Sequence, residues 1–149
     1  MSLFALLKKD HQDVQKLMED LKSSSHEKNR KQELFQSIFN QLYAHNKAEA
    51  KFVYKALKSM AEDKPLAEKS IMEHKMAEDL LDELQSTFLS LTDNVWDEKF
   101  SQLHELVLKH IQKEESEIFD ELEESFEEKE LEALAQAFKE EKSKILAEQ

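Results

Sequence analysis

The chain contains no glycine among its 149 residues, and this absence constrains its fold more than any other feature. Glycine provides the positive backbone angles of tight hairpin turns and lets the backbone approach bound phosphates closely. Phosphate-binding loops, dinucleotide-binding motifs and almost every β architecture are therefore excluded. Cysteine is absent as well, which excludes disulfides, cysteine-based zinc fingers and iron–sulfur clusters. A single all-α domain is the fold class that remains.

The charge balance and the hydropathy restrict the partners and the compartment. Acidic residues number 33 and basic residues 21, which gives a net charge of −12. Such a surface repels nucleic acids and anionic membranes, so we expect neither as a partner. No segment is as long and apolar as a transmembrane helix, and residues 1–10 become charged too early for a secretory signal. These features predict a cytoplasmic protein.

Apolar residues recur with the period of an α-helix in segments that polar breaks separate. Pro65 suits the first turn of the third segment, and Thr92 offers an N-cap for the fourth. We predict an all-α, up-down-up-down four-helix bundle over about residues 2–124, followed by an additional C-terminal helix over about residues 129–146. One domain, residues 1–149, contains both. The helices of the predicted bundle cover about residues 2–22, 29–61, 65–91 and 92–124.

The apolar stripe of each helix in the predicted bundle is interrupted by histidine or glutamate. A histidine and a glutamate four residues apart lie on the same helix face, one turn apart, so both side chains can reach one point. Counting residues from the breaks places the whole set within roughly 12 Å along the bundle axis. The set comprises His11, His45, Glu49, His74, Glu78, His110 and Glu114.

Histidines and glutamates at one height in the core have two possible explanations. A buried histidine is usually a core residue with a hydrogen-bond partner, and a buried glutamate–histidine pair can be a structural salt bridge. Burying several ionised carboxylates without a cation, however, costs on the order of several kcal/mol each. A pair of metal ions removes this cost. Imidazole with carboxylate, in the absence of sulfur, suits iron, manganese or zinc. We therefore predict a site for two metal ions.

Two tyrosines and a histidine are predicted to lie outside the ligand set. Tyr43 and Tyr54 point about 160–180° away from His45 on a regular helix, so no tyrosine is expected beside the metal ions. His104 lies about 120° around the helix from His110, and we expect it to flank the site.

The order of the candidate ligands resembles a known family. His11, His45-x-x-x-Glu49, Glu73-His74 and His110-x-x-x-Glu114-Glu115 form a pattern similar to that of hemerythrin-like domains, specifically the bacterial HHE cation-binding group, over about residues 2–124. The resemblance implies a four-helix bundle around a non-haem di-iron centre, with an oxo or hydroxo group between the two irons. It further implies that Glu49 and Glu114 bridge the ions and that the terminal ligands are His11, His45, His74 and His110.

The third and fourth helices depart from the pattern of the oxygen-carrying hemerythrins. Those proteins have His-x-x-x-His and His-x-x-x-x-Asp, where this chain has His74-x-x-x-Glu78 and His110-x-x-x-Glu114. This difference argues against simple oxygen transport, and Glu78 is either a metal ligand or a hydrogen-bond partner of one. The family's roles lead us to expect binding or sensing of dioxygen or nitric oxide, or a reaction with peroxide. The alternatives are an iron-handling or iron-sensing module and a structural bundle without redox chemistry, so enzymatic activity is left open.

Overall fold

The structure, a computed structural model, describes residues 2–23 and 27–149 and contains helices and no strand within them. The middle of the first predicted break, which includes His26, lies outside the described residues. Two π-helical segments, η1 (Glu49–Tyr54) and η2 (Glu114–Ile118), join α2 to α3 and α5 to α6 without interruption. The α-helices are α1 (Leu3–Ser23), α2 (Lys28–Ala48), α3 (Lys55–Lys58), α4 (Lys64–Thr87), α5 (Asp93–Lys113), α6 (Phe119–Ser125) and α7 (Glu128–Glu148).

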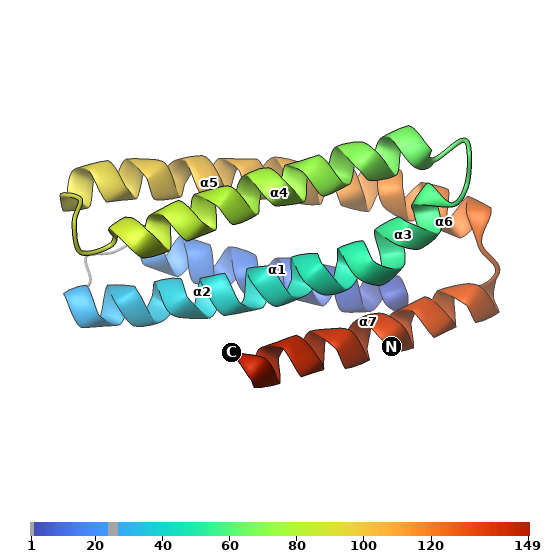
Figure 1. The fold of residues 1–149 in the computed structure, drawn as a ribbon, viewed down its shortest axis with the longest axis horizontal. Helices are drawn as coiled ribbons and strands as arrows, with labels where there is room; N and C mark the ends of the chain where they lie inside the picture. Colours follow the sequence, from blue (N-terminus) through green and yellow to red (C-terminus); the bar gives the residue numbers. More distant parts are fainter. Residues whose placement is uncertain (1, 24–26) are drawn as a thin grey trace.

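The helices form a bundle of four long rods that alternate in direction (Figure 1). The first rod is α1, the second is α2 with η1 and α3, the third is α4, and the fourth is α5 with η2 and α6. The last helix, α7, lies along the outside of α1 and α2. The predicted all-α four-helix bundle with an additional C-terminal helix is therefore confirmed.

The helix bounds differ from the predicted ones mainly at the carboxyl ends. The structure ends α3 at Lys58 and α4 at Thr87, earlier than the apolar periodicity predicted. Turns follow both helices, and the backbone N–H of Leu91 donates to the carbonyl of Thr87 at 3.0 Å. Pro65 lies in the first turn of α4, as expected. Thr92 precedes α5 with an extended backbone, but its side chain makes no capping hydrogen bond.

A polar layer divides the core into two apolar clusters. Along α1, Leu7 belongs to one cluster and Val14 to the other, and the buried His11 lies between them. The other three rods pass through the same order of apolar, polar and apolar residues. Because a shift of one helical turn would move charged groups into an apolar cluster, this layer holds the four rods in register.

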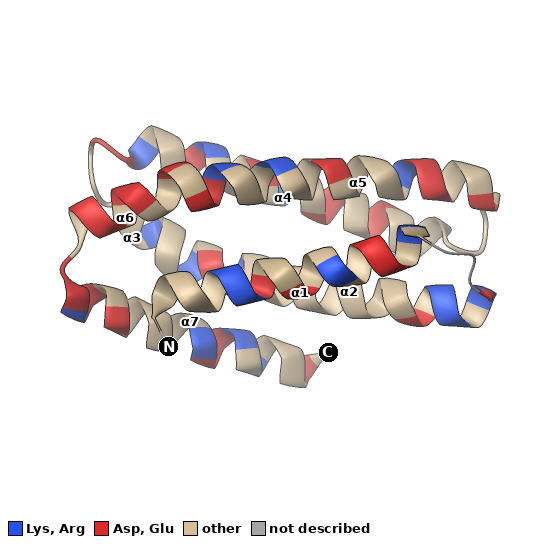
Figure 2. Ribbon diagram, turned by 180° about the vertical axis from the view of Figure 1, so that it is seen from behind, with Lys and Arg blue, Asp and Glu red and all other residues tan. Residues whose placement is uncertain are grey.

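Charged side chains occur on all the long helices, and acidic ones are densest on α6 and at the start of α7 (Figure 2). A charged outer face and an apolar inner face are typical of helices in a bundle in water. Among the described residues, no helix combines the length and the apolar character that crossing a membrane requires.

Candidate metal centre

The polar layer brings together six of the seven predicted ligands in two groups that share Glu114. Within each group, the ligand atoms lie within 4.8 Å of one another, close enough to surround one ion. Glu49 and Glu114 are fully buried at 0% exposure, and the histidines are nearly so. One group is Glu49, His74, His110 and Glu114, and the other is His11, His45 and Glu114.

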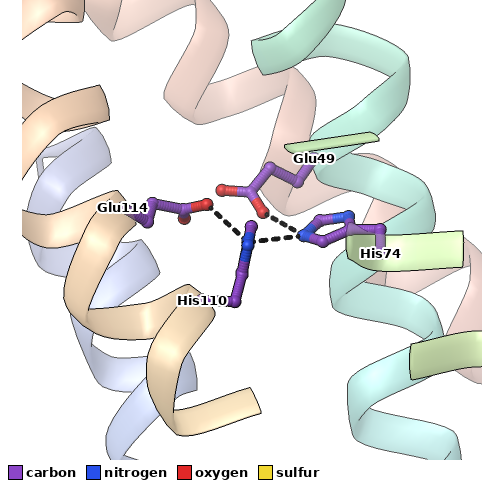
Figure 3. Close-up of side chains that lie close together, drawn as sticks. All are labelled: Glu49, His74, His110 and Glu114. Atoms are coloured by element: carbon purple, nitrogen blue, oxygen red, sulfur yellow. Dashed lines mark hydrogen bonds and ion pairs between the residues drawn. The ribbon is translucent and has the colours of Figure 1, made fainter. Parts of the chain in front are cut away.

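The larger group is drawn from three of the rods (Figure 3). His74 of α4 points toward Glu49, and its Nε2 lies 3.2 Å from the Glu49 Oε1. His110 of α5 lies one helical turn before Glu114, and its Nε2 is 3.1 Å from the Glu114 Oε2. The Nε2 atoms of His74 and His110 are 3.0 Å apart. Two imidazole nitrogens and two carboxylates thus converge on one point.

Each buried glutamate lies between the two groups. The Oε1 atom of Glu49 is 3.3 Å from the Nε2 of His45, in addition to its contact with His74. The two oxygens of Glu114 face different histidines, since Oε1 is 3.4 Å from the Nε2 of His11 while Oε2 faces His110. Each of the two carboxylates therefore contacts one histidine of either group.

Acidic side chains outside this layer orient three of the histidines. In each case the Nδ1 atom is hydrogen-bonded to a carboxylate, which leaves the Nε2 atom directed at the centre. This arrangement fixes both the ring orientation and the tautomer of a metal-binding histidine. The pairs are His11 with Glu115 at 2.7 Å, His45 with Asp10 at 2.8 Å, and His110 with Glu73 at 2.8 Å.

The carboxylates and histidines of the layer are strongly coupled electrostatically. Burial favours a low pKa for His45, but the neighbouring carboxylates, Glu49 foremost, raise the pKa to about 10. Burial acts in the same way on His110, whose contacts with Glu114 and Glu73 raise its pKa to about 9. Burial would raise the pKa of Glu114, yet its hydrogen bonds in the layer hold that pKa well below the ordinary value. The carboxylates thus require nearby positive charge, which histidine protons or metal cations supply.

Several polar atoms in this layer have no hydrogen-bond partner among the described residues. Among the candidate ligands, they are the Nε2 of His11, both carboxylate oxygens of Glu49, the Nδ1 of His74 and the Oε1 of Glu114. Buried polar atoms without a hydrogen-bond partner are rare in folded proteins, because such an atom loses its hydration and gains no hydrogen bond. The atoms of His11, Glu49 and Glu114 face the centre, and all are lone-pair donors suited to iron, manganese or zinc. The residues present therefore fit a pair of metal ions.

Glu78, the seventh predicted ligand, belongs to neither group. Its carboxylate pairs with the Nζ of Lys47 at 3.2 Å, and its side chain is 18% exposed. Along α4, the inward-facing positions after His74 are the buried Ala77 and Leu81. Glu78 lies at the flank of that stripe in the regular helix α4, whereas Glu49 and Glu114, with the same spacing from a histidine, each begin a π-helical segment. The structure therefore does not bring Glu78 to the centre.

Tyr54 lies in the site, so the expectation that no tyrosine would be beside it was wrong. Its hydroxyl is 3.2 Å from the Nε2 of His74 and 3.0 Å from the Nε2 of His110, and it donates a hydrogen bond to Glu114. The cause is η1, because a π-helical turn contains more residues than an α-helical turn and rotates the following side chains. Burial and the charges of Glu114 and Glu49 raise the pKa of Tyr54 well above its ordinary value, so the phenol keeps its proton.

His104 belongs to neither group. Its Nδ1 is 3.2 Å from the Nζ of Lys22, on the side of the larger apolar cluster. The side chain is buried, and this burial lowers the pKa of His104. His104 therefore contributes no atom to the two groups.

A small cavity of about 20 Å³ adjoins the histidines on the side of the larger apolar cluster. The four candidate ligand histidines form part of its wall together with Asp10, Asn46 and Glu73. A space of this size admits a molecule about as large as water. The rest of the wall is apolar and consists of Val14, Leu42, Ala77, Leu106, Val107 and Ile111.

Comparison with known proteins identifies the family. Residues 2–122 match the model of the hemerythrin HHE cation-binding domain. Because this match spans most of the chain, the protein belongs to that family, and its buried histidine and glutamate groups lie within the matched residues. No curated protein and no solved structure matches the chain. The family match includes α1 to α5 and part of α6, and it ends before α7.

Proposed function

We propose that this chain is a dinuclear non-haem iron protein that binds a small diatomic molecule, dioxygen or nitric oxide, or reacts with peroxide. The observation that carries this proposal is the cavity of about 20 Å³ beside the histidines. Its size suits a molecule as small as a diatomic one. The apolar side of its wall offers no hydrogen bonds to water, so a weakly polar ligand competes well for that part of the space.

The two buried glutamates would bridge the two iron ions. Each faces one histidine of either group at distances of 3.1–3.4 Å, which supports this assignment. Iron in such a site supplies the redox chemistry with which dioxygen, nitric oxide and peroxide react. The oxo or hydroxo bridge that the family implies belongs to the same proposal. The remaining ligands would be histidine pairs, His11 with His45 and His74 with His110.

The surrounding residues would hold the ligands and a proton in place. Asp10, Glu73 and Glu115 accept the Nδ1 protons of three histidines, so each Nε2 lone pair stays directed at the centre. The Tyr54 hydroxyl retains its proton next to Glu114. A buried proton donor beside the site favours a reactive role over a purely structural one.

Filling the cavity tests this proposal without changing a ligand. Ala77 lines the apolar wall and is 4% exposed. Ala77→Leu is expected to retain its iron and to bind nitric oxide at least about tenfold more weakly, a loss of about 1.4 kcal/mol. The measurement is an anaerobic titration of the iron-loaded protein with nitric oxide, followed by absorption spectroscopy.

Ala133→Leu, at an exposed position of α7, is the matched control. It adds the same atoms to a helix surface and is expected to bind nitric oxide as the wild type does. Equal affinities in Ala77→Leu, Ala133→Leu and the wild type would show that the ligand does not occupy this cavity.

A further inference from the structure

The C-terminal helix α7 lies against the half of the bundle that carries His11 and His45. Because the family match ends at residue 122, the family description assigns this helix no role. The helix nevertheless makes two kinds of contact that lead directly to a candidate metal ligand.

The first contact is a ring packed on a ligand. Phe138 of α7 is 1% exposed, and its ring meets that of His45 edge-on at a centroid distance of 5.5 Å. The ring of His45 also meets that of His11, at 5.2 Å. His45 thus packs against an aromatic ring from α7 as well as against candidate ligands, since its ring also lies 6.5 Å from that of His74.

The second contact is a chain of two ion pairs that runs from α7 through Asp10 to His45. The Nζ of Lys142 lies 2.6 Å from the Oδ1 of Asp10, whose Oδ2 lies 2.8 Å from the Nδ1 of His45. Both carboxylate oxygens of Asp10 are therefore engaged, one by α7 and one by the ligand. The side chains of Asp10 and Lys142 are only 12% and 18% exposed, so this pair is better shielded from solvent than a surface salt bridge.

A second ion pair joins α7 to the segment that begins with Glu49. The Nζ of Lys51 lies 3.1 Å from the Oε2 of Glu141. The side chain of Lys51 is 56% exposed, so the pair contributes little to stability, but it lies on the same side of the centre as the two stronger contacts.

The two metal positions differ in their relation to α7. Within the described residues, the hydrogen bonds, ion pairs and ring contacts that α7 makes with the bundle reach His45, Asp10 and Lys51, and none reaches His74 or His110. His110 is oriented instead by Glu73 from α4. An outer hydrogen-bond partner of a metal-binding histidine typically changes metal affinity by about 10- to 100-fold.

We propose that α7 is a lid that secures the His11/His45 metal position and acts on the His74/His110 position only indirectly, with the smaller effect there. Phe138 and Lys142 act as positioning residues through His45 and Asp10. Docking of α7 and occupancy of this one position are then linked, and by reciprocity each stabilises the other to the same extent. The inference rests on the proposed function only in requiring two metal positions.

The test is an anaerobic titration with ferrous iron of the wild type, Lys142→Met and Lys144→Met. Methionine keeps much of the length of lysine and removes the charge. Lys144, exposed on the same helix, is the matched control. We expect Lys142→Met to bind one iron with close to wild-type affinity and the other at least about tenfold more weakly. Lys144→Met is expected to match the wild type.

Hydrogen exchange of the α7 amides provides the second measurement. Ferrous iron is expected to slow exchange in α7 by at least about tenfold in the wild type, and much less in Lys142→Met. Phe138→Ala is expected to behave as Lys142→Met does, provided that its far-ultraviolet circular dichroism shows an intact bundle.

The failures of the two proposals are distinguishable. A wild type that binds no iron would overturn the proposed function and, with it, the role of α7. A wild type that binds two irons while Lys142→Met has the same two affinities would overturn only the role of α7. Equal weakening of both positions, or α7 exchange that iron leaves unchanged, would also overturn the lid.

Discussion

The hydroxyl of Tyr54 donates a hydrogen bond to the carboxylate of Glu114, so the last residue of η1 is joined to the first residue of η2. Each π-helical segment begins with one of the two buried glutamates, Glu49 or Glu114. Such segments are frequent at functional sites, because they redirect side chains that a regular helix would place elsewhere. The two irregular segments thus meet at the candidate metal centre.

Tyr54→Phe removes the hydroxyl that donates to Glu114 while it preserves the buried ring. We expect the free energy of unfolding of the metal-free protein to fall by about 1–3 kcal/mol, because a buried carboxylate loses a hydrogen-bond donor. Urea unfolding measures this change. Tyr43→Phe is the control, since Tyr43 is only partly buried and stacks on Phe39. Equal stabilities of the two variants would contradict the expectation.

Glutamate-to-glutamine substitutions separate a bridging position from a flanking one. Glu49→Gln is expected to lose the dinuclear site, because a neutral amide is a poor bridge between two cations. Glu78→Gln is expected to retain two irons, since its carboxylate contacts Lys47 and belongs to neither group. Iron per chain is the measurement. Loss of iron in Glu78→Gln would return that residue to the ligand set.

The stability of the metal-free protein is expected to decrease as the pH rises above neutrality. The pKa values of His110 and His45 are raised from 6.5 to about 9 and about 10 in the folded state. Their stabilising contribution is therefore complete below about pH 6.5 and is lost as the pH rises through about 9 and 10. Thermal melts in chelator at pH 6.5, 8 and 9.5 measure this trend. A constant or rising midpoint would contradict it.

Metal removal is expected to destabilise the fold. Binding to the folded state alone adds about 4 kcal/mol when free metal is at a thousandfold excess over its Kd. Thermal melts of the metal-free and iron-loaded protein at one pH compare the two states. Coincident midpoints would show that no bound cation is needed to offset the cost of burying the charged carboxylates.

The fold could be predicted because the helical segments are long. Within each segment of the bundle, the apolar pattern is interrupted only where the polar layer crosses it. The helix ends were less predictable: beyond Lys58 and Thr87 the apolar pattern continues into turns. Periodicity describes which face is buried and says little about where backbone hydrogen bonding changes. The breaks were therefore located more accurately than the last residue of each helix.

The candidate site was predictable as far as regular helical geometry holds. Six predicted ligands converge because each interrupts an apolar stripe at the same height, although their role as ligands stays a prediction. Tyr54 was missed because η1 rotates the side chains beyond Glu49, and no local signal announced that irregularity. Glu78 was predicted as a ligand because residues four apart lie on nearly the same helix face. In α4 this places Glu78 beside the inward-facing positions and not among them.

The contacts of α7 could not be predicted from the sequence. Lys142 and Asp10 lie far apart in the chain, and many lysines could pair with many carboxylates in so charged a sequence. Periodicity predicts that α7 has an apolar face and does not specify which helices that face covers. The link from Lys142 to His45 therefore appears only once the helices are packed.

Iron content tests the central claim most directly. It is measured per chain in protein purified without added chelator from cells supplied with iron. The account predicts two irons per wild-type chain, held by a site that Glu49→Gln destroys. Purified wild-type protein that contains no iron, and that takes up none when ferrous iron is added anaerobically, would contradict the account and favour a structural helical bundle.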